Sequence, residues 1–233
     1  MTADSLAVIQ AQVVECGQCP RLRAYCDEVA RVRRRAFATQ EYWGRPVPAW
    51  GDAAARIMLV GLAPAAHGAN RTGRMFTGDR SGDFLFAALH RAGLANQASS
   101  SGRGDGLRMR DVWMSAAARC APPGNKPLAE EFARCRPYLG AEMRALPRLR
   151  VVVALGRLAH EQVIALWLAE ARIEQRAGLR FAHGGEAQLR DGLHLLDSYH
   201  PSQQNTFTGR LTAAMLDAVL QRARWLAGTE PIS

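Results

Sequence analysis

Five cysteines carry the clearest chemical signal in this sequence of 233 residues. Cys16 and Cys19 form a CxxC pair, and Cys120 and Cys135 follow much later in the chain. Four thiolates can hold either structural zinc or an iron–sulfur cluster, and the spacing does not separate the two. Cys26 falls outside the pair pattern, and we interpret it as a packing residue. The set predicts a metal centre, against the alternative of buried, unpaired cysteines in a core.

A second candidate for chemistry is the segment at 61–79, with the sequence GLAPAAHGANRTGRMFTGD. Its small residues allow backbone amides to approach a flat ligand closely. Phe76 offers a stacking face and Asp79 a carboxylate, while Arg71 and Arg74 can meet phosphates. An ordinary Gly-rich turn with a core phenylalanine has the same composition. This segment alone therefore does not identify a function.

A third candidate is the segment SYHPSQQNTFTGRLT at 198–212. His200 can donate a hydrogen bond to an oxygen that gains negative charge. Ser202 can bond a phosphate, and Gln203 and Asn205 lie on an expected exposed, polar turn. A lone histidine is more often structural, but the position of His200 opposite the first loop favours a functional interpretation.

Four continuous apolar runs predict the strands that position these residues. They lie at 56–62, 111–117, 151–155 and 193–199, and unbroken runs are typical of parallel strands that are covered on both faces. Helical patterns separate or flank them at 81–92, 128–145, 157–169 and 209–226. Alternating strands and helices predict a three-layer α/β/α sandwich around a four-stranded parallel sheet. Ligands of such sheets bind at the carboxyl ends of the strands, where the unusual segments fall.

The whole chain, 1–233, is expected to form one domain. Residues 1–50 stand outside the strand–helix alternation, with helical patterns at 6–15 and 21–35, and we interpret them as a cluster-anchored extension of that domain. A Ser/Gly-rich stretch at 96–106 predicts a flexible loop. The first twelve residues lack the basic start and apolar block of a secretory signal, and no apolar run is long enough to span a membrane. A cytoplasmic, nucleoid-associated protein is expected.

The net charge of +9 makes nucleic acid the leading class of partner. Lys126 is the single lysine, so compositional drift toward arginine could produce the same charge. An odd number of cysteines argues against a disulfide framework.

Taken together, these motifs resemble the uracil-DNA glycosylase superfamily, most closely its family 5, the iron–sulfur branch. The resemblance rests on the segments at 61–79 and 198–212, on ARCAPPGNKP at 118–127, and on CGQCPRL and YWGRPVPAWGD near the N-terminus. It covers nearly the whole chain. The resemblance implies a [4Fe–4S] cluster, which selects iron over zinc, and it assigns the four ligands to Cys16, Cys19, Cys120 and Cys135.

The resemblance also implies residue roles. Phe76 matches the aromatic residue that stacks on the extruded base, and His200 the histidine that stabilises charge on the departing base. Asp79 would orient or activate the attacking water, and Asn125 would help to hold sugar, water or base. The candidates for DNA contact are gathered from all three segments: Arg71, Arg74, Lys126, Ser202, Gln203 and Asn205. The segment containing the last three matches one that enters the duplex in similar enzymes.

Two departures from the superfamily pattern concern the base pocket, which we assign to Gly61, Ala63, Phe76 and Ala116. Ala63 replaces the usual Asp or Asn of the first motif and removes the usual water activator. Ala116 replaces the Asn with which the uracil-specific family 4 reads the edge of uracil. A pocket without that amide discriminates weakly between bases.

We therefore expect a monofunctional glycosylase that removes uracil, hypoxanthine and xanthine from DNA and leaves an abasic site, with etheno-adducts as further candidates. The expected partner is double-stranded DNA, with single-stranded DNA as an alternative, and the expected state is a monomer. Two alternatives remain open: a strictly uracil-specific family 4 enzyme, and a non-catalytic nucleic-acid binder with zinc on the four thiolates.

Overall fold

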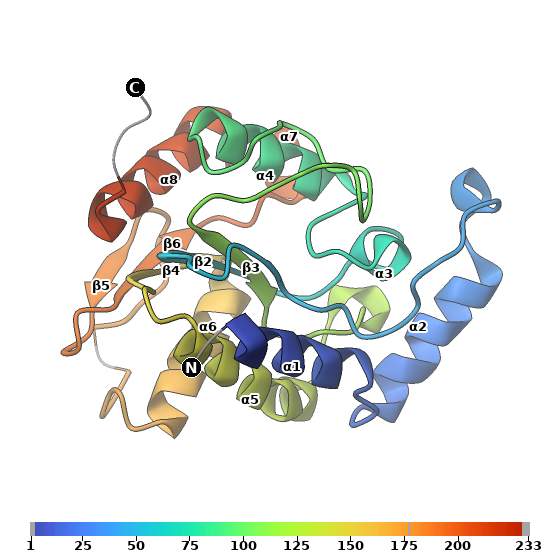
Figure 1. The fold of residues 1–233 in the computed structure, drawn as a ribbon, viewed down its shortest axis with the longest axis horizontal. Helices are drawn as coiled ribbons and strands as arrows, with labels where there is room; N and C mark the ends of the chain where they lie inside the picture. Colours follow the sequence, from blue (N-terminus) through green and yellow to red (C-terminus); the bar gives the residue numbers. More distant parts are fainter. Residues whose placement is uncertain (1–2, 177, 230–233) are drawn as a thin grey trace.

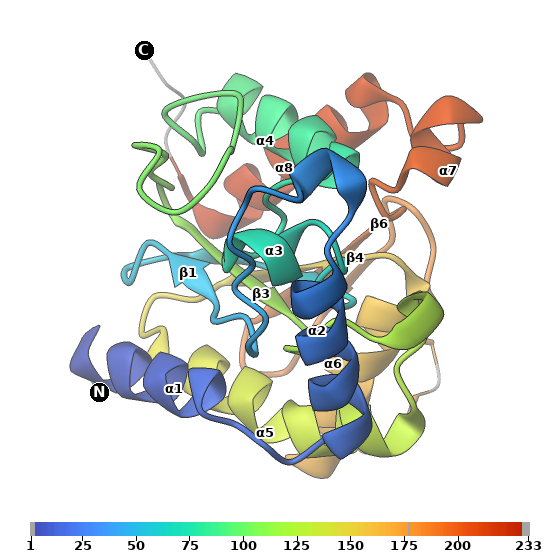
Figure 2. The same ribbon diagram turned by 90° about the vertical axis from the view of Figure 1, so that its right-hand side faces the viewer.

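The protein is a three-layer sandwich in which helices cover both faces of one sheet (Figures 1 and 2). The structure is a computed structural model, and it describes residues 3–176 and 178–229. Apolar residues of α4 (Arg80–Arg91) and α8 (Ala213–Ala227) pack on one face of the sheet. On the other face, the core includes residues of α1 (Ala3–Val14), α5 (Ala129–Ala145) and α6 (Arg157–Ala169). The α/β/α prediction is confirmed at this level.

The sheet has six strands in the order β1-β3-β2-β4-β6-β5. The strands are β1 (Trp50–Gly51), β2 (Ile57–Gly61), β3 (Val112–Ala116), β4 (Val151–Leu155), β5 (Glu186–Gln188) and β6 (His194–Ser198). The inner four are parallel and coincide with the four predicted runs, whereas β1 and β5 pair antiparallel at the edges. The predicted number of strands, four, is therefore too small, because the sheet has six. The two edge strands have two and three residues, too few to show a periodic pattern.

The parallel register brings the carboxyl ends of the inner strands to one edge of the sheet. Gly61 of β2 is opposite Ala116 of β3, and Leu155 of β4 is opposite Ser198 of β6. Residues of β2, β3 and β4 are buried throughout, as expected for parallel strands covered on both faces. The segments at 61–79 and 118–127 therefore leave the sheet from neighbouring strands, and the segment at 198–212 leaves the same edge beyond β4.

The N-terminal residues join the rest of the molecule through buried polar contacts. Gln10 of α1 donates to Glu142 of α5 at 2.9 Å, and its side-chain oxygen accepts the amide of Ala49 at 2.7 Å. Glu142 also pairs with the buried Arg119 at 2.7 Å. A buried carboxylate needs such partners, because leaving it unpaired costs several kcal/mol. The helix α2 (Pro20–Val32) continues from this region and lies near α3 (Ala69–Thr72), as Figure 2 shows.

Several predicted boundaries differ from the structure. The last helix begins at Ala213 rather than at residue 209, because the Thr212 hydroxyl accepts the amide of Met215 and caps the helix there. Short helices were not predicted, and they are α3, α7 (Gln203–Phe207) and the 3-10 turns η1 (Arg35–Phe37) and η2 (Pro123–Asn125). None of the described helices combines the length and the apolar character that crossing a membrane requires.

The segment at 96–106 is anchored rather than flexible. Asp105 forms an ion pair with Arg74 and accepts the amides of Ser101 and Leu107 at 2.8 and 3.0 Å. Residues on either side of the segment, Ala95 and Met109, form a β-bridge. Its Ser/Gly-rich composition predicted a loop correctly, but composition could not show that a buried ion pair fixes the loop.

Candidate functional site

Phe76 lies directly against the carboxyl end of β2. A Cβ atom at Gly61 would stand 2.5 Å from the ring atom Cζ of Phe76, so only glycine admits the ring there. Phe76 has a φ of 59°, a left-handed conformation that is costly for a bulky residue. Gly82 supports this backbone, since a Cβ at that position would stand 1.7 Å from the carbonyl oxygen of Phe76. Phe76 also packs against the apolar cluster that contains Ala116.

Asp79 combines a structural role with an open position. Its Oδ1 accepts the amide of Gly82 at 3.0 Å and caps α4. Its Oδ2 faces the preceding loop, where a Cβ at Gly68 would stand 2.4 Å away. Asp79 and Gly68 both line a cleft of about 660 Å³, which also borders Gln203 and Phe207 of α7. The cap role was missed in the sequence, although Asp before a helix is a typical capping signal.

His200 follows β6 and packs against the residue that follows β4. A Cβ at Gly156 would stand 3.0 Å from the Cβ of His200. The side-chain Nδ2 of Asn205 donates to the His200 carbonyl oxygen at 2.8 Å and holds the turn. Burial lowers the pKa of His200, and the negative charge of Asp79 partly opposes that shift. The imidazole is therefore held neutral near pH 7, within the electrostatic reach of the carboxylate.

The structure brings Phe76, Asp79 and His200 to the same edge of the sheet, as predicted. Phe76 contacts the end of β2, His200 contacts the residue after β4, and Asp79 acts on His200 through its charge. The cleft reaches Asp79 but is not lined by Phe76 or His200. Gly61 and Ala116 of the predicted pocket are buried in paired strands, whereas Ala63 packs toward Ala117, Ala118 and Phe132.

Two of the predicted phosphate contacts have structural partners. Arg74 is 7% exposed, pairs with Asp105, donates to Ser100 and lies over the ring of Trp50. Arg71 donates to the carbonyl oxygens of His67 and Gly78 and covers the Phe37 ring at 4.0 Å. The geometry of Arg74 does not fit phosphate binding, because its donors are consumed inside the protein. An arginine in a glycine-rich loop is a sequence signal that fits both a phosphate contact and an internal structural partner, so the sequence could not separate the two.

The remaining predicted DNA contacts lie at the surface. Lys126 is exposed after β3, and next to it Asn125, which was predicted as a catalytic residue, is also exposed and has a φ of 58°. Ser202 accepts the amide of Asn205 at 3.4 Å and caps α7, which leaves the exposed Gln203 on the cleft. Asn205 is occupied by its bond to His200, so its position fits the support of that residue better than contact with DNA.

The cysteines converge from three segments. Cys19, Cys26 and Cys120 are buried in one small cluster, and Cys135 lies close enough to interact with Cys19 and Cys120. Burial raises the pKa of Cys19 and raises that of Cys135 to about 12. All five thiols are free of disulfides.

The donor chemistry fits a metal centre, but the arrangement does not fit one ion. Within residues 3–176 and 178–229, no three His, Cys, Asp or Glu side chains are placed to share a single metal ion. A cluster of several irons spreads its ligands more widely than one ion does, and buried thiols on separate segments suit that geometry. Cys26 donates to the carbonyl oxygen of Ala121 at 3.6 Å, as a packing residue can.

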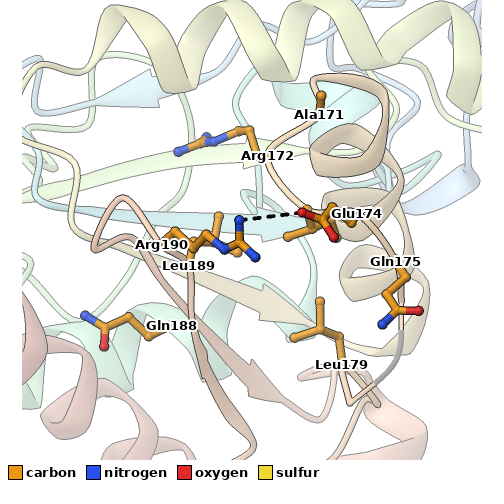
Figure 3. A pocket seen from close by; sticks show the side chains of 9 residues that line it. Ala171, Arg172, Glu174, Gln175, Leu179, Gln188, Leu189 and Arg190 are labelled. Atoms are coloured by element: carbon orange, nitrogen blue, oxygen red, sulfur yellow. Dashed lines mark ion pairs between the residues drawn. The ribbon is translucent and has the colours of Figure 1, made fainter.

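A separate pocket of about 360 Å³ follows the C-terminal end of α6 and borders β5 (Figure 3). Figure 3 shows Arg190 and Glu174 facing each other across it, in an ion pair of 3.5 Å. Because α6 begins at the carboxyl end of β4 and runs back, this pocket lies toward the opposite edge of the sheet. It contains none of the predicted site residues.

Comparison with known proteins adds to this geometry. Residues 48–224 match the family model "Uracil DNA glycosylase superfamily". A type-5 uracil-DNA glycosylase of Mycobacterium leprae is 54% identical over 97% of each chain, and one of Thermus thermophilus is 50% identical over 97% of this chain and 99% of its own. A type-4 uracil-DNA glycosylase of Pyrobaculum aerophilum is 32% identical over 54% of this chain and 57% of its own.

The two roles of Asp79 are separable by substitution. Asp79→Asn keeps a good helix cap but removes the charge, so we expect base release to slow by at least about tenfold, roughly 1.4 kcal/mol, with unchanged stability. Asp79→Ala should show the same slowing and also lose about 1 kcal/mol of unfolding free energy. Single-turnover kinetics and denaturant unfolding measure the two effects. Full activity in Asp79→Asn would reduce Asp79 to a helix cap.

The pKa values of His200 and His160 should be shifted in opposite directions. His200 should titrate below its ordinary value of 6.5, and Asp79→Asn should lower its pKa further because an opposing charge is lost. Burial is the largest single influence on His160 and acts to lower its pKa, but the 2.8 Å hydrogen bond to Asp197, the charge of that carboxylate and the bond to the Leu179 carbonyl oxygen together outweigh it, so the pKa is raised. Since the folded pKa of His200 is below the unfolded one, its contribution to stability is lost as pH falls below about 6.5. NMR titration measures both groups, and a His200 midpoint at or above 6.5 contradicts the burial.

Proposed function

This chain belongs to the uracil DNA glycosylase superfamily and is a DNA glycosylase with type-5 relatives, and from this premise we propose that it removes uracil and other deaminated bases through Asp79 and His200. Uracil-DNA glycosylase activity follows from the family. The finer proposal is that hypoxanthine and xanthine are substrates as well, that etheno-adducts are further candidates, and that the product is an abasic site.

The observation that supports this most directly is the placement of a carboxylate and an imidazole within electrostatic reach of each other at the sheet edge where the ring of Phe76 contacts the end of β2. A base inside a duplex must be extruded before a pocket can hold it, at a cost of a few kcal/mol. The cost is smaller at a mismatch such as U·G, so extrusion itself favours deaminated bases. The face of Phe76 then provides a surface for stacking.

Bond cleavage develops positive charge on the sugar and negative charge on the base. A preorganised hydrogen-bond donor at the base is worth about 3–4 kcal/mol in comparable oxyanion sites, and His200 is the residue placed for this role. The carboxylate of Asp79 has one oxygen free of its capping bond. That oxygen can orient water toward the sugar and stabilise its developing positive charge.

Broad specificity is proposed from what the pocket does not contain. Ala116 is 2% exposed within an apolar cluster, and it offers no amide to the edge of a base. Sites that hydrogen-bond one substrate reject others by large factors, whereas apolar surfaces discriminate weakly.

The proposal is tested with duplexes that contain uracil, hypoxanthine, xanthine or ethenocytosine. We expect release of uracil and hypoxanthine within about tenfold of each other, because the pocket carries no group that reads one edge. Ala116→Asn should raise the preference for uracil, which makes it the matched variant. Release of uracil alone by the wild-type protein would identify a uracil-specific enzyme and overturn the broad-specificity proposal.

We also propose that Cys16, Cys19, Cys120 and Cys135 bind a [4Fe–4S] cluster. The cluster would link the N-terminal segment to the loop after β3 and to α5, and would supply stability rather than catalysis. Cys16 interacts with Tyr138, one turn after Cys135, and Tyr138 also feels the charge of Cys135, which supports including Cys16 in the ligand set. No step of base removal requires the cluster.

Cys120→Ser should lose iron and visible absorbance and become less stable, whereas Cys26→Ser should keep the iron. These substitutions are matched because both thiols are buried in the same cluster. Iron and sulfide analysis, visible spectra and thermal unfolding provide the measurements. A zinc-loaded, colourless wild-type protein, or iron loss in Cys26→Ser alone, would refute this ligand assignment.

A further inference from the structure

One side of the cleft beside Asp79 is formed by a helix that contributes no buried residue to the core. This helix is α7, which has five residues, and its last residue, Phe207, is 69% exposed. Phe207 lines the cleft together with Gln203, while residues 34, 36 and 37 form the opposite side. A large aromatic ring that contributes no core packing is typical of a surface that meets a ligand.

Phe207 is already paired with a cation. The guanidinium of Arg80 lies over its ring, 5.6 Å from the centroid. Arg80 is the first residue of α4, where the helix dipole disfavours positive charge. Within the described part of the chain, no carboxylate lies within ion-pair distance of Arg80, although Asp83 is electrostatically near it. An anion supplied by a ligand would compensate this charge.

A hydrogen bond also connects α7, the helix that ends at Phe207, to the turn that contains His200. Asn205 of α7 donates to the His200 carbonyl oxygen, and its own carbonyl oxygen accepts the amide of Leu211. Leu211 is buried in the main core. The short helix is therefore fixed at both sides, so Phe207 is presented at a set distance from His200 rather than on a free loop.

We infer that Phe207 and Arg80 form a platform for the nucleotide that flanks the extruded one, with the base stacked on Phe207 and its phosphate facing Arg80. The inference rests on the DNA glycosylase function and adds a second stacking surface to the one proposed at Phe76. The cleft volume of about 660 Å³ lies in the range of small-ligand sites, and the chemistry required is an aromatic face next to a cation.

The matched control is Trp225, which is also 69% exposed and also has an arginine, Arg222, over its ring at 4.2 Å. Trp225 lies on α8 and does not line the cleft. Phe207→Ala and Trp225→Ala thus remove equally exposed, arginine-stacked rings that differ in position. Both variants should unfold at the wild-type temperature.

The experiment measures affinity for a duplex with a tetrahydrofuran abasic analogue at fixed salt, with 2-aminopurine next to the analogue on either side. Phe207→Ala should weaken binding by about tenfold and restore 2-aminopurine fluorescence on one side, because stacking is lost. Phe207→Trp should bind as well as the wild type, and Phe207→Leu should not. Arg80→Gln should reduce the slope of log affinity against log salt by about one phosphate contact.

Equal loss in Phe207→Ala and Trp225→Ala, or no loss in either, would overturn the platform. Full binding by Phe207→Leu would also overturn it, since an apolar residue without a ring would then suffice. The glycosylase function is judged separately by uracil release from the wild-type protein, so failure of the platform is distinguishable from failure of that function.

Discussion

The whole candidate site depends on side chains that lie very close to the backbone of three glycines. Phe76, Asp79 and His200 each lie where a Cβ atom would stand within 3.0 Å, at Gly61, Gly68 and Gly156 respectively. Gly61 ends β2 and Gly156 follows β4, so the parallel register brings these two to one edge, whereas Gly68 lies in the loop after β2. Any larger residue there would displace an aromatic ring, a carboxylate or an imidazole, so the chemistry depends on the absence of three side chains.

Buried ion pairs fix the loops that this arrangement needs. Arg74 and Asp105 hold the segment at 96–106 against the first candidate segment, and Arg119 and Glu142 join the loop after β3 to α5. Each pair is covered from solvent, which makes the loss of one partner far more costly than the loss of an exposed pair. Arginine thus has two uses in this basic chain: some guanidinium groups hold loops, and others, including Arg80, remain available at the surface.

The carboxylate–imidazole pair links stability with reactivity. Asp79 caps α4 through one oxygen, and its charge also favours the protonated form of His200. Burial acts on His200 in the opposite sense and is the stronger influence. The folded edge therefore lowers the pKa of His200 below that of a free imidazole, and the Asn205 side chain holds the turn that contains it.

The sequence by itself determined the four inner strands, the main helices and the segments that carry the chemistry. Long apolar runs and helical periodicity are local signals, and each element of this kind is long enough to show one. It also gave Phe76, Asp79 and His200 as candidate site residues, through residue types and resemblance. Only the tertiary structure decided that Arg74 is buried, that Asn205 supports His200, and that Phe207 borders the cleft. Those outcomes depend on which distant residues become neighbours. The edge strands and α7 are too short to show a periodic pattern in the sequence, so they could not be predicted from it.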